Sequence, residues 1–439
     1  MKKQILIIIL LSPNLLFGQD SLSLMDAIRI SMWNNYDIQI TAKQQHINRI
    51  NNNWGNAGAL PSINLSAKKE EALSDQSNNP ASFIQQKLRS ASLSGNGSVS
   101  WTLFNGFAIR ANKARLKNLE EISNNNATLT IENTIQGVIL QYYNCILQKK
   151  KLDLLQEVMN LSKERLKYEK GKYDIGVISK IELLQIENSM LTDSSNIILQ
   201  EMNYKNAIKN LNLTLAVNSE MNWIFSDIID TKIQLYNFED LESSALSSNT
   251  NIKNQYYNIE LSKQDIKLAM APFYPMISLN AGAAYNESTY DIGDLSNSMG
   301  NTGESINYFA NFSVNLRIFD GGKLYKKIKS LKIQKDINNI QLEKTEKEVL
   351  HSLSLANGRY NNLIKIYKLN QKAFEIAEVN YKLANNNQNR GVINSFVFRD
   401  IEIAYINSGI NTQQAAFNLM EAKIALLKIT GGIIQDFSK

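Results

Sequence analysis

Four segments of the chain alternate hydrophobic and polar residues with a period of two. In the clearest one, from Tyr308 to Ile318, every second residue is hydrophobic and most residues between them are polar. Alternation of this kind is typical of β-strands that have one apolar and one polar face. The other three segments fall at residues 63–67, 98–103 and 277–285. Together the four segments predict two β-hairpins, at 61–104 and 275–319.

The connections inside these hairpins are expected to be exposed loops. Residues 68–92 and 286–306 are rich in serine, asparagine, glycine and aspartate, as surface loops usually are. Each hairpin opens at a proline, Pro61 or Pro275, and the residue before a proline avoids the helical conformation. We therefore expect a helix to end before each proline. These two helices span about 20–56 and 240–270.

Two long segments carry helical periodicity. From Leu353 to Ala384, residues on one face recur at alternating spacings of three and four, which is the 3.5-residue repeat of helices that pack as a coiled coil. The segment that contains this repeat, 322–390, predicts one helix of about 100 Å at 1.5 Å per residue. Residues 106–171 predict a second helix of similar length, in which Lys149 interrupts the repeat.

Each long helix is expected to end at a glycine-containing turn, at 171–179 or 386–395, and to be followed by a returning helix. Ser179 and Asn394 suit the N-cap positions of the returning helices, because their side chains can accept a bond from free backbone N–H groups. Glycine also releases the backbone where each hairpin passes into a long helix. The caps expected at those junctions are Asn105 and Asp320.

The two halves of the chain repeat each other about 215 residues apart. Matching order and spacing at separated places indicate a duplicated unit of helix, hairpin and helix pair. The matching pairs are Pro61 with Pro275, Leu103-Phe104-Asn105-Gly106 with Ile318-Phe319-Asp320-Gly321, Gly176-Val177-Ile178-Ser179 with Gly391-Val392-Ile393-Asn394, and Thr214 with Thr430. The expected organisation is a first repeat at 19–214, a linker at 215–239, a second repeat at 240–430 and a C-terminal tail at 431–439.

The N-terminus has the features of a secretory signal peptide at 1–18. Two lysines are followed by the unbroken apolar run from Ile5 to Leu11, and the small residue Gly18 offers a cleavage point. No later stretch has the roughly 20 apolar residues that a transmembrane helix needs. We therefore expect an exported chain whose membrane-spanning part, where there is one, uses strands.

Composition and motifs argue against an enzyme and against a cofactor. The two histidines, His46 and His351, lie far apart without cysteine or carboxylate at metal-ligand spacing, and no phosphate-binding glycine loop opens a helix. The single cysteine, Cys145, rules out an intramolecular disulfide and is expected to be buried. A net charge of +6 is too small and dispersed to indicate nucleic-acid binding. The densest basic run, 149–151, is expected to be a solvated helix face.

These features together resemble the TolC-type outer-membrane efflux proteins. The resemblance is carried by the signal peptide, two copies of helix–strand–strand–helix–helix, Phe319-Asp320-Gly321-Gly322 after a hairpin, and the two Gly-Val-Ile-Ser/Asn turns. It covers essentially the whole mature chain. It implies a mainly α protein with a small β part, in which three copies form a twelve-stranded outer-membrane β-barrel continuous with a periplasmic α-barrel of long coiled-coil helices.

The chain itself supports a trimeric ring. Four strands cannot close a barrel, and open strand edges are not tolerated in lipid. Three copies supply twelve strands, an even number that cyclic symmetry can close. A helix near 100 Å is about three times the thickness of the hydrocarbon layer, so it must project away from the membrane.

The resemblance also implies a location and partners. The protein is expected in the outer membrane of a Gram-negative bacterium, in contact with outer-membrane lipid and projecting into the periplasm. There it would bind a periplasmic adaptor (membrane fusion) protein and serve an inner-membrane transporter of RND or ABC type. Its expected function is the passive exit duct of a tripartite efflux pump or of a type I secretion system. The alternative is a periplasmic coiled-coil adaptor or structural protein, which leaves the four alternating strands unexplained.

The resemblance finally points to site residues, which fall into three groups. The adaptor-contact candidates are Gly176, Val177, Ser179, Gly391, Val392 and Asn394. The candidates for a constriction at the periplasmic end are Glu182, Arg399 and Asp400. The strand–helix junction residues are Pro61, Gly106, Pro275, Asp320, Gly321 and Gly322. Acidic pairs at six and nine residues past the second turn's glycine are typical of the family, and here only Asp400 matches, because Val397 takes the first position.

Overall fold

The computed structural model describes residues 21–229, 231–292 and 301–437. The predicted signal peptide lies outside this part of the chain. The chain divides into two compact units. Unit 1 contains the described residues of Met1–Ala42, Asn126–Thr250 and Glu346–Lys439, and unit 2 contains those of Lys43–Asn125 and Asn251–Thr345.

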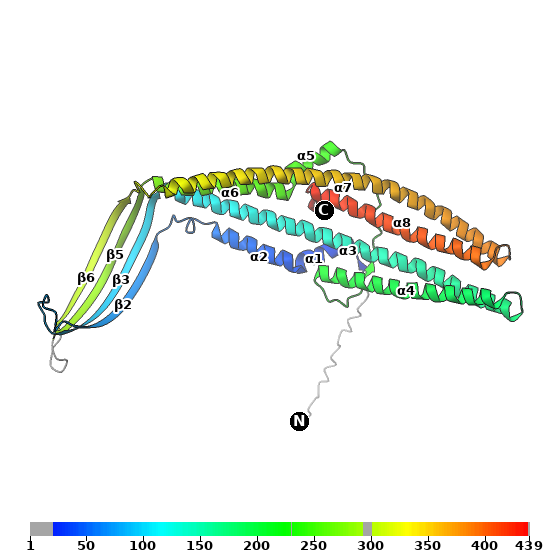
Figure 1. The fold of residues 1–439 in the computed structure, drawn as a ribbon, viewed down its shortest axis with the longest axis horizontal. Coiled ribbons are helices and arrows are strands. Elements are labelled where there is room, and N and C mark those ends of the chain that lie inside the picture. Colours follow the sequence, from blue (N-terminus) through cyan, green and yellow to red (C-terminus); the bar gives the residue numbers. More distant parts are fainter. Residues whose placement is uncertain (1–20, 230, 293–300, 438–439) are drawn as a thin grey trace, which may run out of the picture. The chain divides into compact units, whose positions relative to one another are not determined.

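Unit 2 contains one four-stranded antiparallel sheet in the order β2-β3-β5-β6 (Figure 1). Strands β2 and β5 begin directly after Pro61 and Pro275, as the sequence predicts. The two central strands, β3 and β5, join the two hairpins, which leaves β2 and β6 as the edges. The bounds are β2 Ser62–Asp75, β3 Lys87–Asn105, β5 Met276–Ile292 and β6 Asn301–Asn315.

The pairing register places the alternating apolar residues of different strands on the same face. Trp101 is opposite Leu279, which is opposite Phe312, and directly opposite side chains lie on one face of a sheet. A bulge leaves Leu103 without a partner, so that Phe104 is opposite Ile277 and takes the place on the apolar face that the alternation gave to Leu103. The apolar face predicted from the sequence is therefore present, with this one shift.

The strands run further than the sequence predicted. Most of 68–92 was expected to be loop, yet β2 and β3 stay paired as far as Asp75 and Lys87, and β5 and β6 as far as Tyr290 and Asn301. The hydrogen bonds between strands are made by backbone N–H and C=O groups, so polar side chains do not end the pairing where both faces of the sheet contact water. At the other end, β6 stops at Asn315, before the predicted Phe319.

The helical part of unit 2 is joined by polar contacts between helices. Arg115 of α3 forms an ion pair with Asp265 of α6 at 2.9 Å, and Asn338 of α7 donates to Ser262 of α6 at 2.6 Å. Few residues of these helices are fully buried. The helices are α2 Tyr36–Asn51 from Lys43 onward, α6 Thr250–Met270 from Asn251 onward, and the first parts of α3 Ala108–Asp174 and α7 Lys323–Asn389, with a short 3₁₀ turn η1 at Ala271–Phe273.

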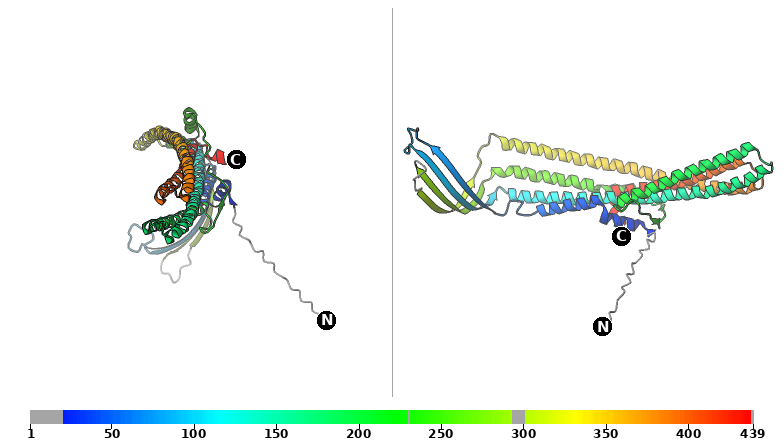
Figure 2. Two further views of the ribbon diagram at one scale, coloured as in Figure 1. Left: turned by 90° about the vertical axis from the view of Figure 1, so that its right-hand side faces the viewer. Right: turned by 90° about the horizontal axis from the view of Figure 1, so that it is seen from below.

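Unit 1 is built from two pairs of helices (Figure 2). The second part of α3 lies beside α4, where Gln200 donates to the Gln148 carbonyl at 2.9 Å. The second part of α7 lies beside α8, where Thr412 donates to the Asn370 carbonyl at 3.0 Å. The other elements are β1 Ser21–Leu22, α1 Leu24–Asn34, β4 Ile224–Phe225, α5 Phe238–Ser248 and α9 Ile433–Phe437, with α4 at Lys180–Leu215 and α8 at Ser395–Ile429.

The predicted coiled-coil seam is the inward face of α7. Leu353, Tyr360 and Tyr381 are buried, and the other seam positions between Leu353 and Ala384 are buried or half-buried while most of their neighbours are exposed. Cys145 is also buried as predicted, and burial raises the pKa of its thiol to about 12.

Two helices predicted as continuous are each broken by an asparagine. Asn35 separates α1 from α2, and Asn249 separates α5 from α6. Both asparagines have extended backbone, with φ −61° and ψ near 125°, and their amides donate to the carbonyls of Thr214 and Ile429. The prediction of single helices at 20–56 and 240–270 was wrong because these tertiary bonds are invisible to local periodicity.

The predicted linker at 215–239 contains structure of its own. Its strand β4 pairs in parallel with β1, and Trp223 and Ile229 belong to the buried core of unit 1. Tyr142 of α3 donates to the Leu22 carbonyl and to the Asp227 carboxylate, each at 2.8 Å. Burial and the Asp227 carboxylate raise the pKa of the Tyr142 hydroxyl. The linker is thus tied to the start of the described chain.

Candidate functional site

The two turns between the long helices and their returning helices share one hydrogen-bonding pattern. We call residues 175–179 and 390–394 the interhelix turns. In the first, Gly176 N–H donates to the Tyr173 carbonyl and Val177 N–H to the Lys172 carbonyl; the second repeats both bonds one for one. This is the Schellman motif, which needs a left-handed residue after the helix. Gly176 and Gly391 supply it, with φ +78° and +73°.

Each interhelix turn ends at a side-chain N-cap, as predicted. Ser179 accepts from Glu182 N–H, and the Glu182 carboxylate accepts from Ser179 N–H, which together make a capping box. Asn394 accepts from the N–H groups of Phe396 and Val397. The Glu182 carboxylate therefore has a structural role in the first turn, alongside the constriction role proposed for it from the sequence.

Several large hydrophobic side chains are exposed around the interhelix turns. Val177 is 64% exposed and Val392 is 68% exposed, and both were named as contact candidates. The structure adds others that the sequence did not single out for this role. These are Ile175, Ile181, Phe396 and Val397.

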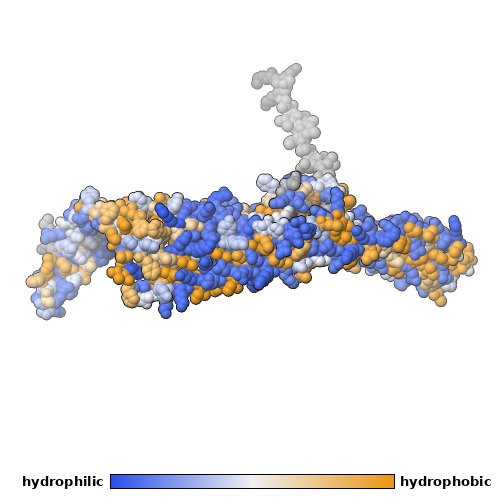
Figure 3. All heavy atoms as spheres, turned by 90° about the horizontal axis from the view of Figure 1, so that it is seen from above, coloured by the Kyte–Doolittle hydropathy of each residue, from blue (hydrophilic) through white to orange (hydrophobic). Residues whose placement is uncertain are grey.

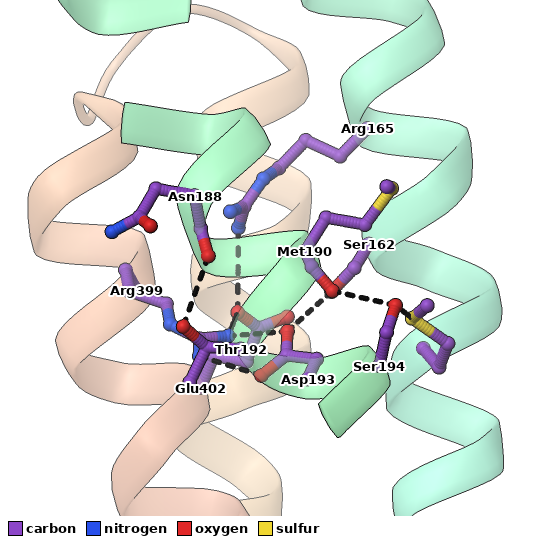
Figure 4. A network of polar contacts seen from close by, with 10 residues as sticks. Ser162, Arg165, Asn188, Met190, Thr192, Asp193, Ser194, Arg399 and Glu402 are labelled. Atoms are coloured by element: carbon purple, nitrogen blue, oxygen red, sulfur yellow. Dashed lines mark hydrogen bonds and ion pairs between the residues drawn. The ribbon is translucent and has the colours of Figure 1, made fainter. Parts of the chain in front are cut away.

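A cluster of charged residues lies within a few helical turns of the chain reversals at 175–179 and 390–394, where α3, α4 and α8 meet in unit 1 (Figure 4). Arg399 of α8 makes two parallel contacts with Asp193 of α4, at 2.6 and 2.8 Å, and a third with Glu402 at 2.8 Å. Both carboxylate side chains are almost fully buried. We call Ser162, Arg165, Asp193, Arg399 and Glu402 the Asp193–Arg399 cluster.

The other two members of the Asp193–Arg399 cluster come from α3. Arg165 reaches the same Glu402 oxygen at 3.5 Å, and Ser162 donates to Asp193 at 3.2 Å. The cluster holds two arginines and two carboxylates, so its formal charge is balanced. Burial lowers the pKa of Arg399, but the bonds to Asp193 and Glu402 outweigh it and the net shift is upward. Arg399 is thus a fixed cation that joins α8 to α4.

An aromatic stack lies beside the cluster and joins α7 to α8. Tyr381 stacks on Tyr405 with ring centroids 4.7 Å apart, and Phe374 also stacks on Tyr405, with centroids 5.5 Å apart. Phe398 packs against Tyr381, and the Arg165 guanidinium lies over the Phe398 ring, 5.1 Å from its centroid. Charged and aromatic contacts therefore connect α3, α4, α7 and α8 near the interhelix turns.

The three constriction candidates are in different environments. Arg399 is held within its own chain by the Asp193–Arg399 cluster, and Glu182 is held by the capping box. Asp400 is exposed and forms no ion pair with any residue that the structure describes. Asp400 is therefore the candidate whose charge is free to act on its surroundings.

The chain matches a family model over most of its length. The model is that of the outer membrane efflux protein, and it matches residues 30–217 and 241–432. The chain belongs to the outer membrane efflux protein family. It is therefore an efflux protein of the outer membrane of a Gram-negative bacterium, and not an enzyme.

Relatives of this efflux protein are found by sequence and by structure. It is 26% identical over 205 residues to the probable efflux pump outer membrane protein TtgC and to the antibiotic efflux pump outer membrane protein ArpC, both of Pseudomonas putida. Those matches cover 44% of this chain and only 38% of the relatives. The fold matches the CmeC outer membrane channel of Campylobacter jejuni with a TM-score of 0.76 and 16% identity, covering 95% of this chain and 89% of CmeC.

The family membership decides between the two functions left open by the sequence. A periplasmic adaptor or rod is not retained, because the family consists of outer-membrane efflux proteins.

No helix among the described residues has the length and hydrophobicity to cross a membrane. Within the same residues, no cluster of histidine, cysteine and acidic side chains has the arrangement of a metal site.

The strand–helix junctions of the efflux protein are capped as the sequence predicts. Asn105 accepts from Ile109 N–H at 3.2 Å, and Asp320 accepts from Leu324 N–H at 3.0 Å. Gly106 has φ +63°, and a Cβ there would lie 2.2 Å from the Ala271 carbonyl oxygen, so the junction requires glycine. Gly321 and Gly322 also have positive φ.

Sequence reasoning missed most of the Asp193–Arg399 cluster. Asp193, Glu402 and Arg165 lie on three helices, far apart in the chain, and each alone reads as a solvated helix residue. The available signal was Arg399 itself, an arginine placed where an acidic lining was expected.

The prediction that the basic run at 149–151 is a solvated helix face was wrong in part. Lys151 is half-buried and donates to Gln414 at 2.9 Å, and burial lowers the pKa of Lys151.

Proposed function

We propose that three copies of this chain form a channel-tunnel that acts as the passive exit duct of a tripartite efflux pump. The observation that carries the proposal is the four-stranded sheet of unit 2, with one apolar face and two unpaired edges. Unpaired edges are not tolerated in a lipid environment, so the sheet requires further copies of itself. Three copies close twelve strands around one pore.

The long helices carry the duct beyond the membrane. Each of α3 and α7 has 67 residues, far more than a membrane-spanning helix. Beside its buried seam, α7 exposes apolar side chains within one chain, among them Leu355, Leu369 and Ile376, which suits a helix that completes its packing against neighbouring copies. An inner-membrane transporter would supply the energy, and a periplasmic adaptor would couple it to the duct. Service to a type I secretion system instead requires only a different transporter.

Planar-bilayer recordings test the proposal directly. In cells, the protein should fractionate with the outer membrane. After purification, it should form ion-conducting pores in planar bilayers. A protein that stays soluble and monomeric and gives no conductance contradicts it. The same preparation after heat denaturation serves as the control for detergent artefacts.

The interhelix turns are proposed as both the adaptor contact and the narrow end of the duct. Gly176, Val177, Gly391 and Val392 present backbone and apolar side chains there, while the caps Ser179 and Asn394 use their side chains within the turn. Photo-cross-linkers at positions 177 and 392 should capture the adaptor in cells. A cross-linker at the exposed position 368 of α7, away from the turns in sequence, is the control.

A double substitution tests the constriction. Asp400→Ala with Glu182→Ala removes two acidic charges per chain, so we expect higher conductance or lower cation selectivity of the pore. Loss of Glu182 also removes half of a capping box, which costs about 1 kcal/mol. Ser179→Ala removes the cap while keeping both charges and separates the two effects. Unchanged conductance and selectivity in a working channel would exclude both acids from the constriction.

A further inference from the structure

The long helices begin with basic residues at the strand–helix junctions. Neither α3 nor α7 has an acidic residue in its first turn, although the helix dipole favours acids there and disfavours cations. Within the two helices the first acidic residues are Glu120 and Asp336, and Asp320 caps the start of α7 from outside the helix. The cations before them are Arg110, Lys113, Arg115 and Lys117 in α3, and Lys323, Lys326, Lys327, Lys329, Lys332 and Lys335 in α7.

Most of these cations have no acidic partner. Arg115 pairs with Asp265, and Lys113 bonds to Asn52. No other cation of the two runs forms an ion pair with a residue that the structure describes, and the same holds for Lys267 of α6. Their charge is thus uncompensated, against the local helix preference, and is available to an anion from outside the chain.

A hollow of about 390 Å³ lies at the junction, between the start of α3 and the end of α6. Two of the uncompensated cations, Arg110 and Lys267, line it together with aromatic and apolar side chains. Arg110 lies over the Phe107 ring at 6.0 Å. The full lining is Gly106, Phe107, Arg110, Ala111, Ala114, Gln264, Lys267, Met270 and Tyr274.

The hollow is continuous with the apolar face of the sheet. Phe107 contacts Phe104 edge-to-face at 5.2 Å and Tyr274 at 5.8 Å. Phe104 lies on the apolar face, opposite Ile277. Figure 3 shows hydrophobic residues gathered where the strands of unit 2 meet its helices. Met270, Phe273 and Phe319, which lie close in sequence to the strand–helix junctions, are exposed. An acyl chain lying on the sheet can therefore reach the hollow without crossing a polar surface.

We propose that this hollow binds the phosphate group of a glycerophospholipid of the periplasmic leaflet, between Arg110 and Lys267, with an acyl chain on Phe107 and the apolar sheet face. The unpaired lysines at the start of α7 extend the cationic surface to neighbouring headgroups. The combination of cations and an apolar approach matches an amphiphile, whereas free phosphate needs no apolar lining. The inference rests on the proposed function, because it requires the apolar face to lie in lipid.

Native mass spectrometry of the detergent-solubilised protein with added palmitoyl-oleoyl-phosphatidylglycerol tests the site. Arg110→Gln with Lys267→Gln should weaken lipid retention about tenfold, because two charge-assisted contacts are lost. Lys365→Gln with Lys368→Gln removes the same charge from exposed positions of α7 in unit 1 and should leave retention unchanged. Arg110→Lys with Lys267→Arg keeps both charges and should retain the lipid, which guards against a folding defect in the first variant.

Two results would overturn the inference. One is equal lipid retention in the Arg110/Lys267 glutamine variant and the Lys365/Lys368 control. The other is complete displacement of the lipid by inorganic phosphate at the same concentration, which would make the hollow a free-phosphate site. Conductance of the wild-type protein in planar bilayers is recorded in parallel. If the wild type forms pores but the Arg110/Lys267 variant and the control retain lipid equally, only the lipid site is rejected. If the wild type forms no pores, the proposed function is rejected.

Discussion

Arg399 and Asp193 show how burial changes what a charged residue does. On an exposed helix face an arginine beside an aspartate contributes little. Here Asp193 and Glu402 are almost fully buried, and each depends on Arg399 to balance a charge that water cannot reach. The pair therefore fixes the position of α8 relative to α4 within unit 1.

A double-mutant cycle measures this dependence. Asp193→Leu should lower the free energy of unfolding by about 3–5 kcal/mol, because it leaves two buried arginines with one carboxylate. Asp193→Leu with Arg399→Leu should lower it by less than the sum of the single variants. Urea denaturation followed by far-UV circular dichroism gives both values.

The matched control is the exposed ion pair between Arg359 and Glu421, at 2.6 Å. Arg359→Leu should change the unfolding free energy by only about 0–1 kcal/mol. Additive effects at Asp193 and Arg399 would show that the two side chains do not act as a pair.

At the scale of elements, glycine decides where the long helices end. The interhelix turns need left-handed backbone at Gly176 and Gly391, and both glycines have open space around the missing Cβ. Their conformation and not their size is therefore what the turns require. Gly358 lies inside α7, where glycine only weakens a helix.

The same substitution should have opposite effects at these positions. Gly391→Ala is expected to destabilise the protein by about 1 kcal/mol, since alanine is strained at φ +73°. Gly358→Ala should stabilise it by about 1 kcal/mol through higher helix propensity, with no steric contact to hinder it. Thermal unfolding midpoints of the two variants provide the measurement, and equal shifts would contradict this account of the turn.

At the scale of the whole molecule, the unpaired edges of β2 and β6 are the main unsatisfied feature of unit 2. One face of the sheet is apolar and its central strands are paired within the chain. The edges account for the proposed trimer, because each β2 can pair only with the β6 of another copy when the ring closes.

Cysteine cross-linking checks this arrangement. In a Cys145→Ser background, single cysteines at Ser62, Asn64 or Ser66 of β2 are combined with one at Asn311 of β6. We expect at least one combination to give covalently closed trimers on oxidation. Cysteines at Ser100 and Asn280, which are paired within the chain, should give monomers only. Higher ladders without a limit at three would contradict the trimer.

Much of the element pattern followed from the sequence because it rests on local rules. Period two places the strands, the 3.5-residue repeat identifies the inward face of α7, and prolines, glycines and caps mark where elements begin and end. The strand lengths and the breaks at Asn35 and Asn249 did not follow, because backbone pairing and amide bonds to distant carbonyls leave no periodic signal.

The sequence by itself determined the order and type of the elements, the apolar faces, the turn glycines and the absence of a catalytic motif, since each depends on neighbours along the chain. Only the tertiary structure decided that Arg399 is bound to Asp193, that β4 pairs with β1, and that Arg110 and Lys267 line one hollow. Those facts depend on residues more than 150 positions apart, and their proximity is set by packing, which no local pattern encodes.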